Sequence, residues 1–185
     1  MKVSIKKAGS LFSIILISMT LLMSGCQSQD DSMNGFTIFP KSNTEKGKEY
    51  VDIVFNAVSE GDEDAVFDLF SDKVKEEVGE KELRSQIEEL IRFYQGTEIL
   101  SKAGAVEENT HNEYGVKRIK MKVLYGIETD NGDYEIALTY VARADEDPEE
   151  EGFECIQIAE KETVEETEGF LWADYEIYHG VIIFE

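Results

Sequence analysis

Apolar residues change their spacing near Gly96, and this change limits the folds open to the chain. Before Gly96 they recur every three or four positions, and after it they recur at every second position. The first spacing is typical of helices with one buried face, and the second is typical of strands. Helices that precede a run of strands indicate an α+β domain. We therefore expect N-terminal helices packed on a curved antiparallel sheet.

The helical part contains four candidate segments. The clearest spans Glu80–Gln95, and Gly96 ends it. An earlier apolar stripe begins at Tyr50 and ends before Gly61. Between them, Asp62 and Ser71-Asp72 are suitable N-caps for two short helices. The two main apolar stripes are Tyr50, Ile53, Val54, Ala57 and Val58, and then Leu83, Ile87, Leu90, Ile91 and Tyr94.

The second part predicts a series of strands joined by turns. Asn131-Gly132 is the strongest hairpin signal, because both residues accept the positive φ of a two-residue turn. The expected strands are Glu98–Glu108, 118–127, Tyr134–Tyr140, Phe153–Ala159, and a last kinked strand over Phe170–Ile177 and Val181–Phe184. The expected connections are a turn at Asn109–Asn112, an acidic loop at Asp145–Gly152, and an irregular acidic segment at Glu160–Glu168.

The first residues are typical of a secretory signal peptide. Three lysines in Met1–Lys7 precede the apolar run Ala8–Met23, which is shorter than the roughly 20 residues that a membrane-spanning helix needs. Ser24-Gly25-Cys26 resembles the lipobox of bacterial lipoproteins, although Met23 replaces the leucine that these proteins prefer. The resemblance implies cleavage before Cys26 and a diacylglyceryl group on its thiol. An ordinary secretory signal or an uncleaved anchor is the alternative.

This resemblance predicts the organisation of the whole chain. Residues 1–25 are the expected signal peptide, 26–43 the lipidated cysteine and a flexible tether, and 44–185 a single α+β domain. The predicted location is the extracytoplasmic face of the cell membrane, where two acyl chains give lasting attachment. If Cys26 is lipidated, Cys155 has no disulfide partner within the chain, and we expect it to be a buried thiol rather than a nucleophile.

The charge of the chain excludes some classes of partner. The 185 residues include 18 basic and 40 acidic residues, and removal of the first 25 residues, with their three lysines, leaves a formal charge of −25. Nucleic acid would be repelled, and the body of the domain would not adhere to anionic lipid. The basic residues cluster at Lys117, Arg118, Lys120 and Lys122. These residues form either a solvated face paired with neighbouring acids or a patch for an anionic ligand.

The domain resembles the nuclear-transport-factor-two-like (cystatin-like) superfamily, and within it a family of bacterial lipoproteins. The segments that carry this resemblance are Tyr50–Ser59, Ala65–Phe70, Gln86–Leu90 with Gly96, the Asp130–Tyr140 hairpin, and Asp145–Pro148 leading into Gly152. The resemblance implies a cone in which a long helix packs on the concave side of the sheet. The superfamily contains enzymes and non-enzymes, so the fold does not define the function.

No catalytic or metal-binding motif stands out. His111 and His179 lack a partner at metal-ligand spacing, and in the loop 145–152 Glu150 occupies the position where an EF-hand requires glycine. We therefore predict no metal site and no cofactor. Aromatic residues in the strands could line a pocket at the mouth of the cone, and Asp174 lies between aromatic neighbours. The candidate ligand-binding residues are Tyr125, Tyr140, Trp172 and Asp174.

These observations predict a lipid-anchored domain that binds a small molecule or an envelope protein without catalysis. One alternative is an isomerase or hydrolase that uses a buried carboxylate in the cone pocket, next to a tyrosine donor. A second alternative is a structural or dimerising component of an envelope assembly, which would expose a flat apolar patch on the outer face of the sheet.

Overall fold

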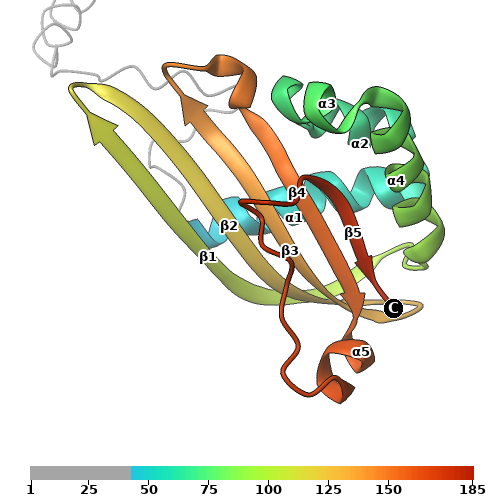
Figure 1. Cartoon of the computed structure of the whole chain (residues 1–185). Coiled ribbons are helices and arrows are strands. Elements are labelled where there is room, and N and C mark those ends of the chain that lie inside the picture. The colour runs from blue at the N-terminus through green and yellow to red at the C-terminus, as the bar shows by residue number, and fades with distance from the viewer. Residues whose placement is uncertain (1–42) are drawn as a thin grey trace, which may run out of the picture. The chain divides into compact units, whose positions relative to one another are not determined.

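A computed structural model describes residues 43–185, which form four helices and then a five-stranded sheet with two further short helices between its strands (Figure 1). The predicted signal peptide, Cys26 and the tether lie outside the described residues. The prediction of an α+β fold is confirmed. Within the described part, no helix is long and apolar enough to cross a membrane.

The helices begin and end close to the predicted positions. They are α1 (Asn43–Glu60), α2 (Glu63–Leu69), α3 (Asp72–Val78) and α4 (Glu80–Phe93). The two predicted caps are present: Asp62 Oδ1 accepts from the backbone N–H of Ala65 at 3.0 Å, and Ser71 Oγ accepts from that of Val74 at 3.2 Å. Each cap satisfies an N–H group that the first helical turn leaves without an intrahelical partner.

The strands follow one another in both sequence and space. They are β1 (Ile99–Glu113), β2 (Val116–Thr129), β3 (Asp133–Ala144), β4 (Gly152–Glu160) and β5 (Gly180–Phe184). A short 3-10 helix, η1 (Pro148–Glu150), precedes β4, and α5 (Lys161–Glu166) follows it. The first four strands pair antiparallel, whereas β5 pairs parallel with β4.

The inner face of the sheet packs against the helices and forms the core. Alternate residues of the strands turn toward α1 and α4, as the period of two predicts. The largest fully buried side chains are Phe55, Phe70, Leu83, Ile87, Leu90, Met121, Tyr125, Ile127, Ile136, Leu138, Phe153 and Ile156.

The outer face of β3 and β4 is covered by the chain that returns from α5 to β5. We call residues 167–179 of this connection the strap, and Figure 1 shows it crossing the sheet. Gln157 of β4 holds it with two hydrogen bonds: its Nε2 donates to the carbonyl of Ala173 at 3.0 Å, and its Oε1 accepts from the N–H of Ala173 at 2.8 Å. Both faces of β4 are therefore buried.

Three of the predicted local structures are wrong. Asn109–Asn112 is not a turn, because β1 continues to Glu113, and Tyr114-Gly115 makes the turn with φ of 52° and 88°. The segment Phe170–Ile177 is not a strand but part of the strap, in which the N–H groups of Ile177 and Tyr178 donate to the carbonyl of Asp174. Glu160–Glu168 is not irregular throughout, since it contains α5.

Candidate functional site

The predicted ligand-binding residues of β2 and β3 are part of the core. Tyr125 is 1% exposed beneath α1, and its hydroxyl donates to the carbonyl of Thr44 at 3.1 Å. The ring of Tyr140 packs on those of Tyr50 and Phe153, with centroid separations of 4.6 and 5.0 Å. These two tyrosines therefore join the sheet to α1 rather than line an open pocket.

The other two predicted residues lie in the strap, on the opposite face of the sheet. Trp172 packs edge-on against Phe170 and Phe184, at centroid distances of 5.1 and 5.5 Å. Asp174 is exposed, and its Oδ1 accepts from the backbone N–H of Glu176 at 3.0 Å, which stabilises a turn. The structure thus does not bring the four predicted residues together. The fifth predicted site residue, Cys26, lies outside the described part of the chain.

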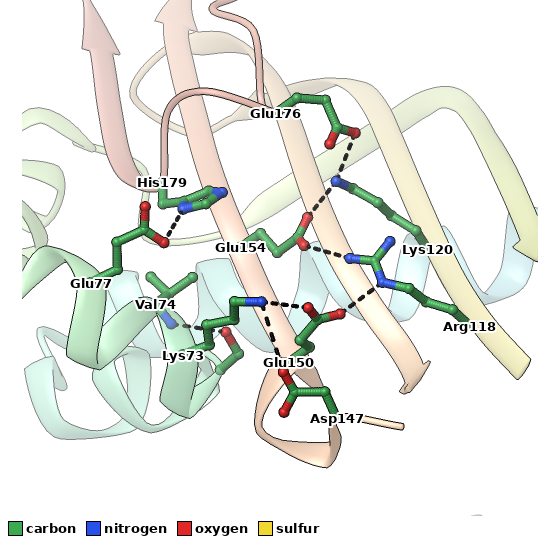
Figure 2. A network of polar contacts seen from close by, with 11 residues as sticks. Lys73, Val74, Glu77, Arg118, Lys120, Asp147, Glu150, Glu154, Glu176 and His179 are labelled. Carbon is green, nitrogen blue, oxygen red and sulfur yellow. Dashed lines mark hydrogen bonds and ion pairs between the residues drawn. The ribbon is translucent and has the colours of Figure 1, made fainter. Parts of the chain in front are cut away.

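What the structure does bring together is the basic cluster of β2 and acids from later in the chain (Figure 2). Glu154 of β4, which is only 8% exposed, contacts two cationic side chains of β2. Its Oε1 lies 3.2 Å from Nη2 of Arg118, and its Oε2 lies 2.8 Å from Nζ of Lys120. The interpretation of this cluster as a face paired with neighbouring acids agrees with the contacts of Arg118 and Lys120, whereas Nζ of Lys122 lies over the ring of Tyr175 at 4.9 Å.

A bulge in the sheet explains why Glu154 points at β2. The pairing of β3 with β4 joins Tyr140 to Phe153 and Thr139 to Cys155, so Glu154 is an extra residue without a partner on β3. An extra residue bends the strand and changes the direction of its side chains. Phe153 therefore packs inward on Tyr140, while Glu154 reaches the outer face.

The network extends to the helices through Glu150 of η1. Its Oε2 lies 2.8 Å from Nε of Arg118, and its Oε1 lies 2.5 Å from Nζ of Lys73 on α3. Hydrogen bonds from Lys73 and then Arg118 lower the pKa of Glu150 below its ordinary value of 4.5. Asp147 adds a longer contact to Lys73 at 3.8 Å. The carboxylate of Glu150 is therefore held between β2 and α3.

The strap closes the network on its other side. Glu176 Oε1 lies 2.9 Å from Nζ of Lys120, and the ring of Tyr175 lies under the same ammonium group at 4.6 Å. Burial alone would lower the pKa of Lys120, but hydrogen bonds to Glu154 and Glu176 outweigh burial and raise it. We call Lys73, Arg118, Lys120, Glu150, Glu154 and Glu176 the charge network.

A pocket of about 310 Å³ lies next to Arg118. One wall is the end of the β1–β2 hairpin and the other is the loop 144–150. Arg118 and Glu150 are shared with the charge network, so two of the lining side chains are fixed by contacts outside the pocket. The residues that line it are His111, Glu113, Tyr114, Val116, Lys117, Arg118, Ala144, Asp145, Glu146, Asp147 and Glu150.

Contacts within the loop keep this pocket in shape. Asp145 Oδ1 lies 2.6 Å from Nε of Arg143, and its Oδ2 accepts from the N–H of Lys117 at 2.9 Å. These interactions, the first of them the largest, lower the pKa of Asp145. Glu151 Oε1 also accepts from the N–H of Ala144 at 3.0 Å. The acidic loop thus directs carboxylates at protein cations and backbone N–H groups.

Metal-ligating side chains do not gather in the described part of the chain. No group of three or more His, Cys, Asp or Glu residues is placed there to hold an ion. His179 contacts Glu77 of α3 at 2.9 Å, and His111 contacts Glu113 at 3.4 Å. Cys155 is fully buried, and burial raises the pKa of its thiol to about 12, so the thiolate that would act as a nucleophile is strongly disfavoured.

Residues 53–165 match a protein family described as a domain of unknown function, DUF5104. The match covers more than half of the chain. The chain belongs to this family. The DUF5104 match begins within α1 and ends within α5, so it includes the charge network except Glu176 and all the residues of the pocket. No curated protein matches the chain.

Sequence reasoning found the cations of the site but not their partners. The run from Lys117 to Lys122 is visible as the one basic cluster of a very acidic chain. Glu150, Glu154 and Glu176 are three among 40 acidic residues. The 3-10 helix η1, the bulge and the strap select Glu150, Glu154 and Glu176 respectively, and none of the three has a clear sequence signal.

Proposed function

We propose that this DUF5104 protein is a lipid-anchored binding module that works outside the cytoplasmic membrane without catalysis. The pocket beside Arg118 is its ligand site. The observation that carries the proposal is the way in which this pocket is built: two of its charged lining side chains, Arg118 and Glu150, are fixed by the charge network. Fixed polar groups favour binding because little side-chain freedom is lost when a ligand enters.

The chemistry of the pocket favours a polar ligand with a positively charged group. Its acids are Glu113, Asp145, Glu146, Asp147 and Glu150, and its permanent cations are Lys117 and Arg118. Asp145 and Glu150 are already paired with Arg143, Arg118 and Lys73, so the negative field of the pocket comes chiefly from Glu113, Glu146 and Asp147. Such a field attracts cations and repels anions. Tyr114, a residue that is 98% exposed at the tip of the hairpin, offers a ring face to such a group.

The state of the reactive groups supports binding rather than catalysis. Glu154, the buried carboxylate of the described residues, contacts two cations instead of a tyrosine donor. The hydroxyl of Tyr50 is directed at Sδ of Met121, 3.7 Å away, and burial raises the pKa of this tyrosine. A general base needs a pKa close to the working pH and access to its substrate, and these groups serve packing instead.

We further infer that the domain is a cystatin-like cone. The order of its elements supports this inference: four helices precede a meander of antiparallel strands, and α1 packs along the inner face of the sheet. The parallel strand β5 is an addition at the end of that meander.

The anchor is tested by labelling the full chain in a bacterial host. Radioactive palmitate should enter the wild-type protein and should not enter Cys26→Ala, which should accumulate as an uncleaved precursor. Cys155→Ala is the matched control and should be labelled like the wild type, because Cys155 is buried. Label in Cys26→Ala would contradict the proposal.

The pocket is tested by native mass spectrometry of the mature chain, purified in detergent from its own membranes. We expect an additional mass that is lost on denaturation and that is absent from Glu146→Lys, a charge reversal of an exposed pocket residue. Glu168→Lys, an exposed position in the strap, should retain the mass. A ligand that stays bound to Glu146→Lys, or no ligand on any variant, would overturn the pocket as the site.

A further inference from the structure

The two edges of the sheet differ in their protection. At one edge, the N–H of Val181 on β5 donates to Oε1 of Gln86 at 3.0 Å, and α4 packs along the strand. At the other edge, β1 pairs with β2 from Ile99 to Glu113, and no other described strand pairs with its second side. The free N–H and C=O groups of a long edge strand form a template for another strand.

The residues in the middle of β1 limit which strands can pair with its edge. Ala103, Gly104 and Ala105 are exposed and small, so a second strand can approach closely. Lys102 is the one charged residue between Leu100 and Val106, and its Nζ bonds Oδ1 of Asp52 on α1. A charge that points inward at a sheet edge excludes partners that do not match it. A partner of β1 that places an acidic residue opposite Lys102 gives this ammonium group a second counter-ion beside Asp52 and is therefore favoured over one that places an apolar or basic residue there.

The same strand contains such a residue. When two copies of a strand pair antiparallel about a two-fold axis, the residues that face each other are equally distant from the axis. With Ala105 on the axis, Lys102 of each copy faces Glu108 of the other. Ala103 then faces Glu107, so no like charges are opposed.

Other registers lose this match. An axis at Gly104 would place Lys102 opposite Val106, and an axis at Val106 would place it opposite Thr110. An axis at Glu107 would bring two carboxylates face to face, which destabilises a sheet. The register centred on Ala105 is therefore favoured among its neighbours.

We propose that a second copy of this chain pairs with β1, antiparallel and centred on Ala105, so that the two sheets become continuous. The charge complementarity comes from β1 itself, since Lys102 and Glu108 belong to one strand. Two chains of the same strongly negative charge repel each other at long range, so salt strengthens the association by screening this repulsion. The binding of a basic segment at the same edge would instead be weakened by salt.

Disulfide trapping tests the register in the full chain. Ala105→Cys is expressed in a bacterial host, the lysate is oxidised, and non-reducing electrophoresis measures the linked dimer. Residues that face each other on the same side of an antiparallel pair have Cβ atoms about 4.5–5.5 Å apart, so small movements allow a disulfide to form. Ala103→Cys is the matched control, because it faces Glu107 and should stay at the wild-type background. We expect the Ala105→Cys dimer to increase with added salt.

A charge exchange tests the pairing between Lys102 and Glu108. In the Ala105→Cys background, Glu108→Lys should weaken association on the order of tenfold, since two attractive pairs become repulsive. Combining it with Lys102→Glu should restore the dimer, whereas Glu168→Lys, the same charge change at an exposed position of the strap, should leave it unchanged. Melting temperatures of all variants confirm folding, and Glu108→Lys keeps the contact between Lys102 and Asp52.

Three outcomes would overturn the proposal. The first is equal trapping of Ala103→Cys and Ala105→Cys, and the second is a dimer that is insensitive to Glu108→Lys. The third is loss of the trapped dimer as salt is added, which would assign the edge to a basic segment of another protein. None of these results bears on the pocket beside Arg118, because its ligand is detected on the single chain.

Discussion

The strands β4 and β1 belong to one sheet but differ strongly in their surroundings. Every residue from Phe153 to Ala159 of β4 is buried, whereas no residue of β1 is buried to the same degree. The helices cover the inner side of β4 and the strap covers its outer side. Within the described residues, β1 packs against α1 on one side, and no other strand pairs with its second edge.

This difference indicates that the stability of the fold and its interactions depend on different parts of the sheet. Strands buried on both faces resist opening, and regions with few buried apolar contacts open at lower free energy. The pocket lies at the end of the β1–β2 hairpin, and the proposed pairing surface is the edge of β1. Both proposed interaction sites therefore use the less buried half of the sheet, while β3 and β4 hold the fold. The following predictions test this division, beginning with the largest effect.

Matched isoleucine substitutions should show the difference directly. Ile156→Ala on β4 removes a fully buried side chain and should lower the free energy of unfolding by about 2–5 kcal/mol. Ile99→Ala on β1, a partly buried position at the margin of the core, should cost less than half as much. Urea denaturation of both variants measures the two values. Equal losses would contradict the proposed division.

Two glycines with positive φ offer a second comparison. Gly180, at the start of β5, has a φ of 91°, and a Cβ added there would lie too close to Oε1 of Gln86. Gly180→Ala should therefore cost about 1–3 kcal/mol. Gly115, in the β1–β2 turn, has a φ of 88° and no neighbouring atom within 4 Å of an added Cβ. Gly115→Ala should therefore cost only the backbone strain, and it should lower the midpoint of thermal unfolding less than Gly180→Ala does.

The helices, the caps and the central hairpin were predictable because short-range rules specify them. Asp62 and Ser71 cap their helices through residues three positions away, and Asn131-Gly132 correctly marks the turn between two alternating strands. The predicted positive φ is wrong, because neither residue has one and both N–H groups instead donate to Oγ1 of Thr129. The strap was not predictable, because Phe170–Ile177 has the composition of a strand. Its actual conformation depends on Gln157, which is far away in sequence and binds the backbone that a neighbouring strand would otherwise pair.

The candidate site was predictable only in part. Aromatic residues such as Tyr125 and Trp172 are equally suited to a pocket or a core, and sequence spacing does not distinguish the two roles. The basic cluster on β2 was visible as a charge pattern. Its acidic partner Glu154 was hidden within an apparently regular strand, because one inserted residue decides which side chains face outward.

We expect that the strap can be loosened while β3 and β4, the strands that it covers, stay folded. Gln157→Ala removes both hydrogen bonds to Ala173 and should lower the free energy of unfolding by about 1 kcal/mol. This is the low end of the range for lost hydrogen bonds, because Ala173 is only partly buried. Limited proteolysis should then cut within residues 167–179 faster than in the wild type. Gln95→Ala, which removes a hydrogen bond on an exposed side chain, is the matched control and should not change the rate. Unchanged cleavage in Gln157→Ala would show that aromatic packing alone holds the strap.

The smallest predicted effect depends on pH and lies where the two halves meet. Glu150 has a lowered pKa in the folded protein, through its contacts with Lys73 and Arg118. Its stabilising contribution is therefore complete above its ordinary pKa of 4.5 and is lost as the pH falls through the lowered value. Glu150→Gln should be less stable than the wild type near neutral pH, and this difference should shrink on acidification. Urea denaturation at about pH 7 and about pH 3 measures the change. Glu149→Gln, a change at the exposed neighbour in η1, is the control and should have the stability of the wild type at both pH values. If the difference in the free energy of unfolding between Glu150→Gln and the wild type stays constant with pH, the ion pairs of Glu150 contribute no net stability.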